Sequence, residues 1–600
     1  MPSNVERHKE SHGMKSSSGR KVGLGLSGGG FRASFFHLGV LARLAEVDAL
    51  RDVQVLSTVA GGSIVGAHYY LEVQRLLESK PDQAVTREDY IDIVWRVQEE
   101  FLKGVQTNIR TSALASFTDN MRMVFTQHYS RSHRLGELYE ERIYARVADG
   151  HPEGQPRTMP DLVIEPEGDP DKTDFKPNLS NRNRRSKVPV LLINTTSLNS
   201  GHNWHFTARW MGEPPGLLGA EVDVNQRYRR LYYEQAPESL RNYRLGYAVA
   251  ASACVPGLFE PLAIAGLYPS HVVRLVDGGV HDSQGVEGLL DEGCVVILCS
   301  DASGQMADLD NPADTTIGSL SRSSAVIRDR VREAQYQDLA GRLAAGDLEG
   351  LFFVHTKQDL DRPPLDWVDC VDATKSAAEV NLTSYGIDKD LQRKIAGLRT
   401  DLDSFTEVEA YALMLSGYLM SEHELRVLKE QGQGTPRAGA WSEYDVSAPR
   451  RDWPFLKLES LCKLGPDSPH PGRQDLGKQL EVGGHGFLKV WHIDPQLRQY
   501  AKRSAVGFGA LTVLLAWALW DSPVFGTSIT WGGVIVSLGA ALLAAAAPIL
   551  KWLEPGKAVR GYVRKALVAV FGYLGTNLHL KVFDPRFLER GRLQRLLDLK

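Results

Sequence analysis

Three short motifs, far apart in the sequence, carry residue types that suit acyl-transfer chemistry. They are Gly28-Gly29-Gly30 followed by Arg32, Gly61-Gly62-Ser63, and Asp277-Gly278-Gly279. A serine can act as a nucleophile, a carboxylate as its base, and main-chain N–H groups as donors to the oxyanion that forms during ester cleavage. The sequence therefore suggests a hydrolytic site, provided that the fold brings the three motifs together.

Ser63 lies between a predicted strand over residues 53–59 and a predicted helix that follows it. A serine on such a turn is lifted above the sheet edge, with the N-terminus of the helix behind it. Gly61 leaves room for the turn. However, Val65 stands where the G-x-S-x-G pattern has glycine, and Gly66 comes one place late. A Gly-Gly-Ser turn that only caps a helix is the structural alternative.

The three consecutive glycines can turn their N–H groups toward one point, where they would hold either an oxyanion or a phosphate. One oxyanion donor is typically worth about 3 kcal/mol. The run GLGLSGGG is superficially similar to a dinucleotide-binding loop, but no third glycine of a G-x-G-x-x-G opens the helix and no acidic residue ends the second strand. A nucleotide-binding protein is therefore the weaker alternative. Arg32 either orients the loop, meets a lipid phosphate or lies on the surface.

Asp277 directly follows a predicted strand over residues 272–276 and begins an Asp-Gly sequence, which is typical of a plain turn. In the functional interpretation its carboxylate is presented at the same sheet edge as Ser63. It would take the serine proton and return it to the leaving group. No histidine stands in an obvious triad context, and His281 is the one that merits a test.

The elements around these motifs predict a doubly wound, mainly parallel α/β sheet flanked by helices. Residues 21–26 and 53–59 each form a strand followed by a glycine turn and a helical pattern. Further strand-like runs lie at 188–193, 272–276, 294–299 and 351–355, and helical patterns at 84–147, 320–346 and 388–430.

The composition is that of a folded globular protein. The 600 residues are 24% charged and 43% hydrophobic, with a formal net charge of −4. These values exclude a disordered chain and a pure multi-span membrane protein. The slightly negative net charge gives no overall electrostatic attraction to nucleic acid. The five cysteines are scattered and form neither a disulfide framework nor a zinc motif. We expect no cofactor.

Two apolar runs near the C-terminus, residues 504–520 and 531–550, flank one formal charge, Asp521. A helix needs about 20 apolar residues to cross a bilayer. Lysine and arginine lie on both sides of this segment but not in the connecting loop, which favours cytoplasmic flanks. We therefore expect a transmembrane hairpin over residues 501–552, with the remaining domain and both termini cytoplasmic. A buried helical hairpin of a soluble domain is the alternative.

Taken together, the motifs resemble those of the patatin-like phospholipase family. The order matches: G-G-G-x-R from Gly28 to Arg32, a serine turn at Gly61-Gly62-Ser63, and D-G-G from Asp277 to Gly279. The runs FFHLGVLARL, NTTSLNSGHNWHF and ASACVPGLFEPLAI are also similar to the family. The resemblance implies a patatin-like fold and a lipid acyl hydrolase with a Ser63–Asp277 dyad and no metal. It makes the amides of Gly28, Gly29 and Gly30 the oxyanion hole. The supporting positions are Gly61, Gly62, Arg32, Gly278 and Gly279.

The expected organisation is a flexible tail over residues 1–20, a catalytic domain over 21–430 with a polar insertion at 151–187, an irregular or helical connector over 431–500, the hairpin, and a basic amphipathic tail over 553–600. That tail fits either a helix on an anionic membrane surface or one packed on the soluble domain.

The expected function is that of a membrane-anchored serine hydrolase that cleaves ester bonds of membrane lipids at the bilayer, with no nucleic-acid partner. The sequence does not determine the oligomeric state. The alternative is a catalytically weak or inactive lipid-binding or scaffold protein on the same fold, an interpretation that Val65 and the extra segments suggest.

Overall fold

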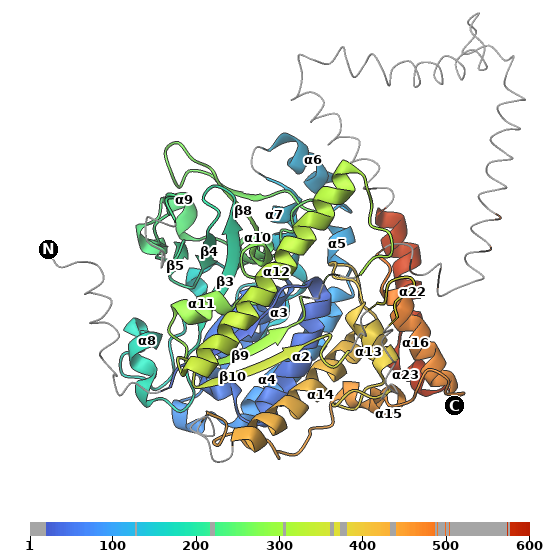
Figure 1. Ribbon diagram of the computed structural model, residues 1–600. Helices are drawn as coiled ribbons and strands as arrows, with labels where there is room; N and C mark the ends of the chain where they lie inside the picture. Colours follow the sequence, from blue (N-terminus) through green and yellow to red (C-terminus); the bar gives the residue numbers. More distant parts are fainter. Residues whose placement is uncertain are drawn as a thin grey trace, which may run out of the picture. The chain divides into compact units, whose positions relative to one another are not determined.

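The computed structural model describes residues 20–126, 129–215, 223–303, 306, 308–360, 365–371, 381–432, 440–486, 489, 492, 499, 503, 573 and 576–599 (Figure 1). The chain divides into two compact units. The first consists of Met1–Ala113, His128–Gly484 and Gly591–Lys600, and the second of Leu114–Gln127 and His485–Arg590. All three sequence motifs belong to the first unit.

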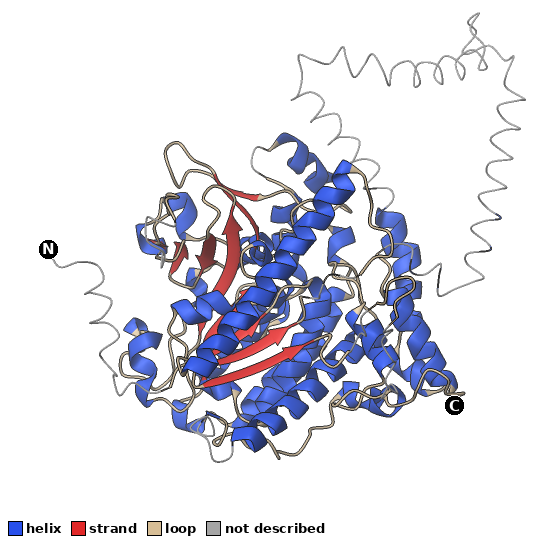
Figure 2. Cartoon of the chain, viewed as in Figure 1, coloured by secondary structure: helices blue, strands red, loops and turns tan. Residues whose placement is uncertain are grey.

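The first unit is built on a central sheet, in which the described residues form ten strands (Figure 2). The strand order is β10-β9-β1-β2-β3-β4-β5-β6, and β8 pairs with both β3 and β7. The strands that pair in parallel are β1 (Val22–Leu26), β2 (Val53–Val59), β3 (Val190–Ser197), β9 (Val296–Asp301) and β10 (Gly350–His355). The antiparallel part adds β4 (Asn203–Phe206), β5 (Trp210–Gly212), β6 (Leu231–Tyr232), β7 (Leu262–Ile264) and β8 (Val273–Asp277).

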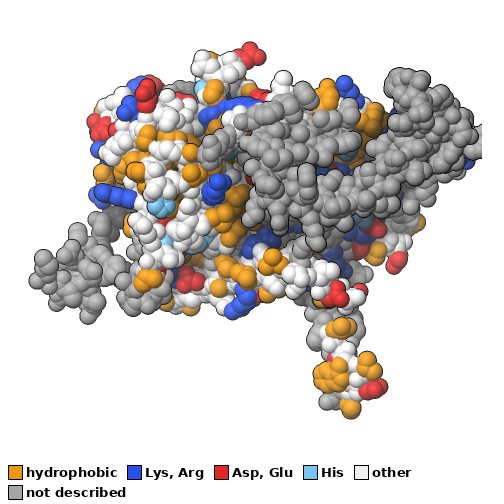
Figure 3. Space-filling model, turned by 90° about the horizontal axis from the view of Figure 1, so that it is seen from above, with side chains coloured by type: hydrophobic (Ala, Val, Ile, Leu, Met, Phe, Trp, Pro, Cys, Tyr) orange, Lys and Arg blue, Asp and Glu red, His pale blue; other side chains and the backbone are white. Residues whose placement is uncertain are grey.

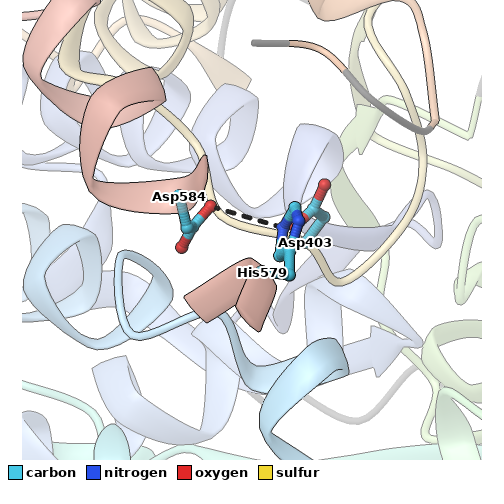
Figure 4. Close-up of side chains that lie close together, drawn as sticks. All are labelled: Asp403, His579 and Asp584. Atoms are coloured by element: carbon cyan, nitrogen blue, oxygen red, sulfur yellow. Dashed lines mark ion pairs between the residues drawn. The ribbon is translucent and has the colours of Figure 1, made fainter. Parts of the chain in front are cut away.

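The helices of the first unit are α2 (Gly30–Glu46), α3 (Gly61–Ser79), α4 (Arg87–Val105), α5 (Ile109–Ser112), α7 (Arg131–Arg142), α8 (Pro177–Ser180), α9 (Glu238–Arg241), α10 (Leu245–Ser252), α11 (Val286–Asp291), α12 (Thr316–Ala345), α13 (Lys389–Ala396), α14 (Glu407–Gly432), α15 (Glu459–Cys462), α16 (Pro471–Gly483) and α23 (Leu593–Leu597). The second unit contains α6 (Phe117–Phe125), a π-helical turn (His579–Phe583) and α22 (Asp584–Arg590). In that unit His579 Nε2 lies 3.9 Å from Asp584 Oδ1, so this ion pair links the π-helical turn to α22 (Figure 4).

Helices cover both faces of the sheet. Successive strand residues point to opposite faces, and they belong to two separate apolar clusters. Leu56 and Leu298 lie in the larger cluster, with α2, α3 and α14. Val55 and Ile297, their neighbours in sequence, lie in the smaller cluster with α11 and α12. Because both faces are covered, almost every residue of the parallel strands is buried, including the polar ones at the ends of β2 and β3.

The predicted α/β architecture, a central sheet flanked by helices, is confirmed. The sheet is mixed: the five strands β10-β9-β1-β2-β3 pair in parallel, and the remaining, shorter strands pair antiparallel. After β3 the chain continues through short antiparallel hairpins instead of another crossover helix, and β8 returns antiparallel to β3. β4 to β7 are only two to four residues long, too short for an alternation to be visible in the sequence, whereas β8 coincides with the run predicted over residues 272–276.

The predicted membrane localisation needs correction. No helix in the part of the chain that the structure describes is both long and apolar enough to span a bilayer. Of the longest described helices, α12 carries charged side chains along most of its length, and α14 carries them toward both ends. On the face drawn in Figure 3, apolar side chains not covered by grey atoms lie among charged and neutral ones. The multi-pass localisation, with a transmembrane hairpin and cytoplasmic catalytic domain and termini, is therefore unsupported. The two apolar runs that suggested it lie outside the described residues.

Helices α2 and α14 pack at backbone-to-backbone distance through glycine. A Cβ atom on Gly39 would overlap the carbonyl oxygen of Met414, and one on Gly417 would overlap the carbonyl oxygen of Phe36. The absence of a side chain at these two positions is therefore what allows the helices to approach so closely.

We expect Gly39→Ala to lower the free energy of unfolding by about 1–3 kcal/mol, because the added methyl group forces the two backbones apart. Gly341→Ala is the matched control. Gly341 lies in α12, and a Cβ there meets nothing within 4 Å. This control should be neutral or should stabilise by up to about 1 kcal/mol. Urea unfolding of both variants measures the difference, and equal effects would contradict the close-packing argument.

Candidate active site

A single residue, Ala60, connects the end of β2 to the start of α3 and forms the sharp turn between them. Its backbone has φ +48° and ψ −115°, a conformation that residues with a side chain rarely adopt. Hydrogen bonds hold it in place. The Ala60 N–H donates to Ser252 Oγ at 2.9 Å. The Ala60 carbonyl accepts from the N–H groups of Ser63 at 2.9 Å and Ile64 at 3.2 Å. The apex of the strand–helix turn is therefore at Ala60.

Ser63 lies in the first turn of α3, three residues after the apex, and its side chain is 0% exposed. Ser63 Oγ donates to Thr58 Oγ1 at 3.0 Å and lies 2.8 Å from Ser252 Oγ. Within the described structure Ser63 and Asp277 share no hydrogen bond. The predicted nucleophile thus belongs to a buried hydroxyl network beneath the turn.

The glycine loop, Gly28-Gly29-Gly30, leads from β1 into α2. The Gly28 N–H donates to the carbonyl oxygen of Ser283 at 2.9 Å. The N–H groups of Gly29 and Gly30 have no hydrogen-bond partner among the described residues. Their φ angles are +133° and +58°, and a Cβ on Gly29 would lie 2.6 Å from Ala302 O. Two of the three predicted oxyanion donors are therefore available, at the N-terminus of a helix where anions are favoured.

The glycine loop and the start of α3 touch through their backbones. A Cβ on Gly61 would overlap the carbonyl oxygen of Gly30, and one on Gly62 would overlap that of Leu26. Ser34 Oγ also donates to the carbonyl oxygen of Gly61 at 2.7 Å. The Gly-Gly pair before Ser63 is thus required by the approach of two loops.

Asp277 ends β8 and pairs with Thr195 of β3. Its N–H donates to the carbonyl oxygen of Cys254 at 3.0 Å, and its Oδ1 accepts from the N–H of Gly279 at 2.7 Å. The side chain is buried, and this desolvation raises the pKa of Asp277 to about 7. A carboxyl group with such a pKa is well suited to accept and return a proton at neutral pH.

The three motifs meet around Val59, and we refer to this place as the Val59 junction. Val59 Cγ1 lies 3.5 Å from where a Cβ of Gly28 would be, 3.2 Å from that of Gly278 and 3.9 Å from that of Gly279. The Cβ of Ala60 lies 3.4 Å from the same position at Gly28. The fold therefore brings the glycine loop, the strand–helix turn and the Asp277-Gly278-Gly279 turn together.

Arg32 is buried and supports the surrounding loops. Its guanidinium donates to four carbonyl oxygens, those of Ala302, Ser303, Ala396 and Leu398, at 3.0–3.1 Å. Of the earlier alternatives, loop orientation fits these contacts, whereas a surface arginine does not.

His281 Nδ1 lies 2.9 Å from Glu287 Oε2, so this histidine is paired with a carboxylate other than Asp277. In the described part of the chain, no group of metal-ligating side chains includes Ser63 or Asp277.

Residues 24–290 match the family model of patatin-like phospholipases, and this range contains all three motifs. It is a patatin-like phospholipase domain. The assignment supports a lipid ester hydrolase. A search of curated proteins found no match.

Solved structures similar to the chain include human GIVD cytosolic phospholipase A2, with 17% identity over 41% of this chain and a TM-score of 0.24. The aligned region spans 30% of that human chain. VipD from Legionella pneumophila has 12% identity, covers 98% of this chain and 94% of its own, and also has a TM-score of 0.24. At these TM-scores the two structures carry no weight in the argument about the patatin-like domain.

Sequence reasoning missed Ala60 and Ser252, which shape the turn of the patatin-like domain. Ser252 stands in the run ASACVPGLFEPLAI, but its bond to the Ala60 N–H depends on the packing of α10 against the sheet. The sequence Gly61-Gly62-Ser63 suggests that the serine is at the turn, but the backbone angles place the apex of the turn at Ala60.

We expect Asp277→Asn to stabilise the patatin-like domain at pH 8 but not at pH 4. Because its pKa is raised in the folded state, Asp277 lowers stability as the pH rises from its unfolded pKa near 4 to about 7. Asparagine does not ionise, so the gain at pH 8 should exceed about 1.4 kcal/mol, the equivalent of one pH unit. Urea unfolding at the two pH values measures it.

Asp301→Asn is the control of opposite sign. Burial opposes ionisation of Asp301 as well, but His355, Ser303 and Gln284 outweigh it and lower its pKa. Loss of that carboxylate should therefore destabilise the domain at pH 8. A stabilised Asp301→Asn, or an Asp277→Asn that is destabilised at pH 8, would contradict the assignment.

Proposed function

We propose that the patatin-like domain cleaves acyl esters of lipids at the Val59 junction. The observation that carries this proposal is the convergence of three distant motifs on Val59. A buried carboxyl group and unpaired main-chain donors are the parts that acyl transfer needs, and both belong to the motifs that meet there.

In this proposal Asp277 is the general base, and the N–H groups of Gly29 and Gly30 hold the oxyanion. Gly28 contributes to the loop conformation, since its own N–H is bonded to Ser283 O. The sequence assigns the nucleophile to Ser63. Ser63 Oγ would lose its proton to Asp277, bond to the acyl carbon and expel the alcohol, which takes up that proton. Water would then hydrolyse the acyl-enzyme. For this route Ser63 must first leave Thr58 and Ser252.

The second candidate is a lipid-binding protein with weak or no turnover on the same fold. Two observations favour it: the full burial of Ser63 in a hydroxyl network, and an alanine at the apex of the turn. Both candidates use the same site and the same class of ligand.

Ester hydrolysis should rise with pH through about 7, because Asp277 accepts a proton only when it is ionised and its pKa lies there. Asp277→Asn should lose at least about 100-fold in kcat/KM. A panel of phospholipid, lysophospholipid and acylglycerol esters, assayed from pH 5 to 9, measures both effects.

Asp282→Asn is the control for this assay. Asp282 is buried close by in sequence and its pKa is also raised, to about 6, but its carboxylate accepts from the N–H groups of Gln284, Gly285 and Glu287. It should not shift the midpoint of the pH profile. A flat profile together with an active Asp277→Asn would remove Asp277 from the mechanism.

A further inference from the structure

We infer that position 60, and not position 63, is where this fold presents a nucleophile, and that Ala60 leaves the natural chain without an attacking hydroxyl there. The inference concerns the same site and favours the second candidate, a lipid-binding protein with weak or no turnover. It rests on the proposed function only in taking the ligand to be an acyl ester. It makes Ser63 a positioning residue.

The backbone gives the first argument. A nucleophilic serine in α/β hydrolases sits on a sharp, strained turn between a strand and a helix. Here β2 ends at Val59 and α3 begins at Gly61, so that turn is Ala60, with φ +48° and ψ −115°. A residue with a Cβ stays in such a conformation only where the surroundings hold it. Ser252 Oγ and two N–H groups of α3 do so. Ser63, by contrast, lies inside the helix.

The main-chain donors give the second argument. At a nucleophile elbow the oxyanion is held by the N–H of the residue after the nucleophile, together with an N–H from a neighbouring loop. After position 60 comes Gly61, whose N–H has no partner among the described residues. After position 63 comes Ile64, whose N–H is already bonded to the Ala60 carbonyl at 3.2 Å. The Cβ of Ala60 also faces the glycine loop, 3.4 Å from the Cβ position of Gly28.

The proton of Ser63 gives the third argument. Thr58 Oγ1 donates to Leu192 O at 3.0 Å, and Ser252 Oγ donates to Asn194 O at 2.6 Å. Each of these hydroxyl groups has one proton, so neither can donate to Ser63. The Ser63 proton must therefore point to Thr58 or to Ser252, and no base receives it. A hydroxyl in this arrangement is satisfied and is not activated.

The link to Asp277 gives the fourth argument. The Ala60 N–H is bonded to Ser252, and the Asp277 N–H is bonded to the carbonyl of Cys254, two residues further along the same segment. Ser252 Oγ also donates to Asn194 O, and the next residue, Thr195, pairs with Asp277. The segment from Ser252 to Cys254 and the end of β3 are thus bonded both to the apex at Ala60 and to Asp277, and they hold the two near each other.

A fluorophosphonate probe tests the inference with Ala60→Ser. The introduced hydroxyl would pass its proton to Asp277 while its oxygen bonds to phosphorus and fluoride leaves, which is the step that ester attack also needs. We expect Ala60→Ser to be labelled at least 100-fold faster than the natural chain. We also expect Ala60→Ser/Ser63→Ala to keep the label, and Ala60→Ser/Asp277→Asn to lose it.

Ala67→Ser is the matched control, because it adds a hydroxyl to the same helix one turn beyond Ser63, away from the apex. It should remain unlabelled. Urea midpoints of all variants establish that each is folded. The inference is overturned if the natural chain is labelled and Ser63→Ala abolishes that label. It is also overturned if folded Ala60→Ser stays unlabelled.

If Ala60→Ser does not fold, labelling of the natural chain by the same probe still tests the inference. Label on Ser63, located by fragmentation of the labelled peptide, refutes the inference, and an unlabelled folded chain supports it. The results that would refute the proposed function differ from those that would refute this inference. Ala60→Ser that reacts with the probe but cleaves no lipid ester refutes the lipid substrate and leaves the position of the nucleophile standing. Lipid cleavage by the natural chain that depends on Ser63 supports the lipid substrate and refutes position 60 as the place of the nucleophile.

Discussion

The whole site depends on a backbone-to-backbone contact between the glycine loop and the first turn of α3. Gly61 lies against the carbonyl of Gly30, and Gly62 against that of Leu26, so no side chain fits at either position. This contact fixes the N-termini of α2 and α3 next to each other. The N–H groups of Gly29, Gly30 and Gly61, which have no partner among the described residues, therefore lie at two adjacent helix N-termini, and a helix N-terminus favours an anion. The carboxylate of Asp277 is delivered to the same region by the pairing of β8 with β3.

Much of the fold follows from the sequence because the decisive signals are local. Short segments rich in Val, Leu and Ile mark the buried parallel strands, and glycine turns after β1 and β2 mark the helix starts. Asp277 is predictable as a strand end because an Asp-Gly pair follows an apolar run. The family match over residues 24–290 agrees with this reading of the motifs.

What the sequence could not determine depends on backbone angles and long-range packing. The letters Gly61-Gly62-Ser63 draw attention to the serine, whereas the position of the apex follows from where β2 ends and α3 begins. The nucleophilic role of Ser63 stays a prediction, and the hydroxyl network that surrounds it requires β3 and α10, both more than 100 residues away along the chain. The membrane localisation rested on hydropathy and on the distribution of lysine and arginine around the two apolar runs, and no described helix supports it.

The pairing of β1 with β9, and of α2 with α14, also has a consequence for biosynthesis. Val22 of β1 lies in register with Val296, and α2 is covered by a helix that begins at Glu407. During translation, one edge of β1 and the apolar side of α2 that packs on α14 stay exposed until β9 and α14 have been synthesised. At roughly 5–20 residues per second, that interval lasts for tens of seconds. The nascent chain is therefore a natural client for factors that shield apolar surface during translation.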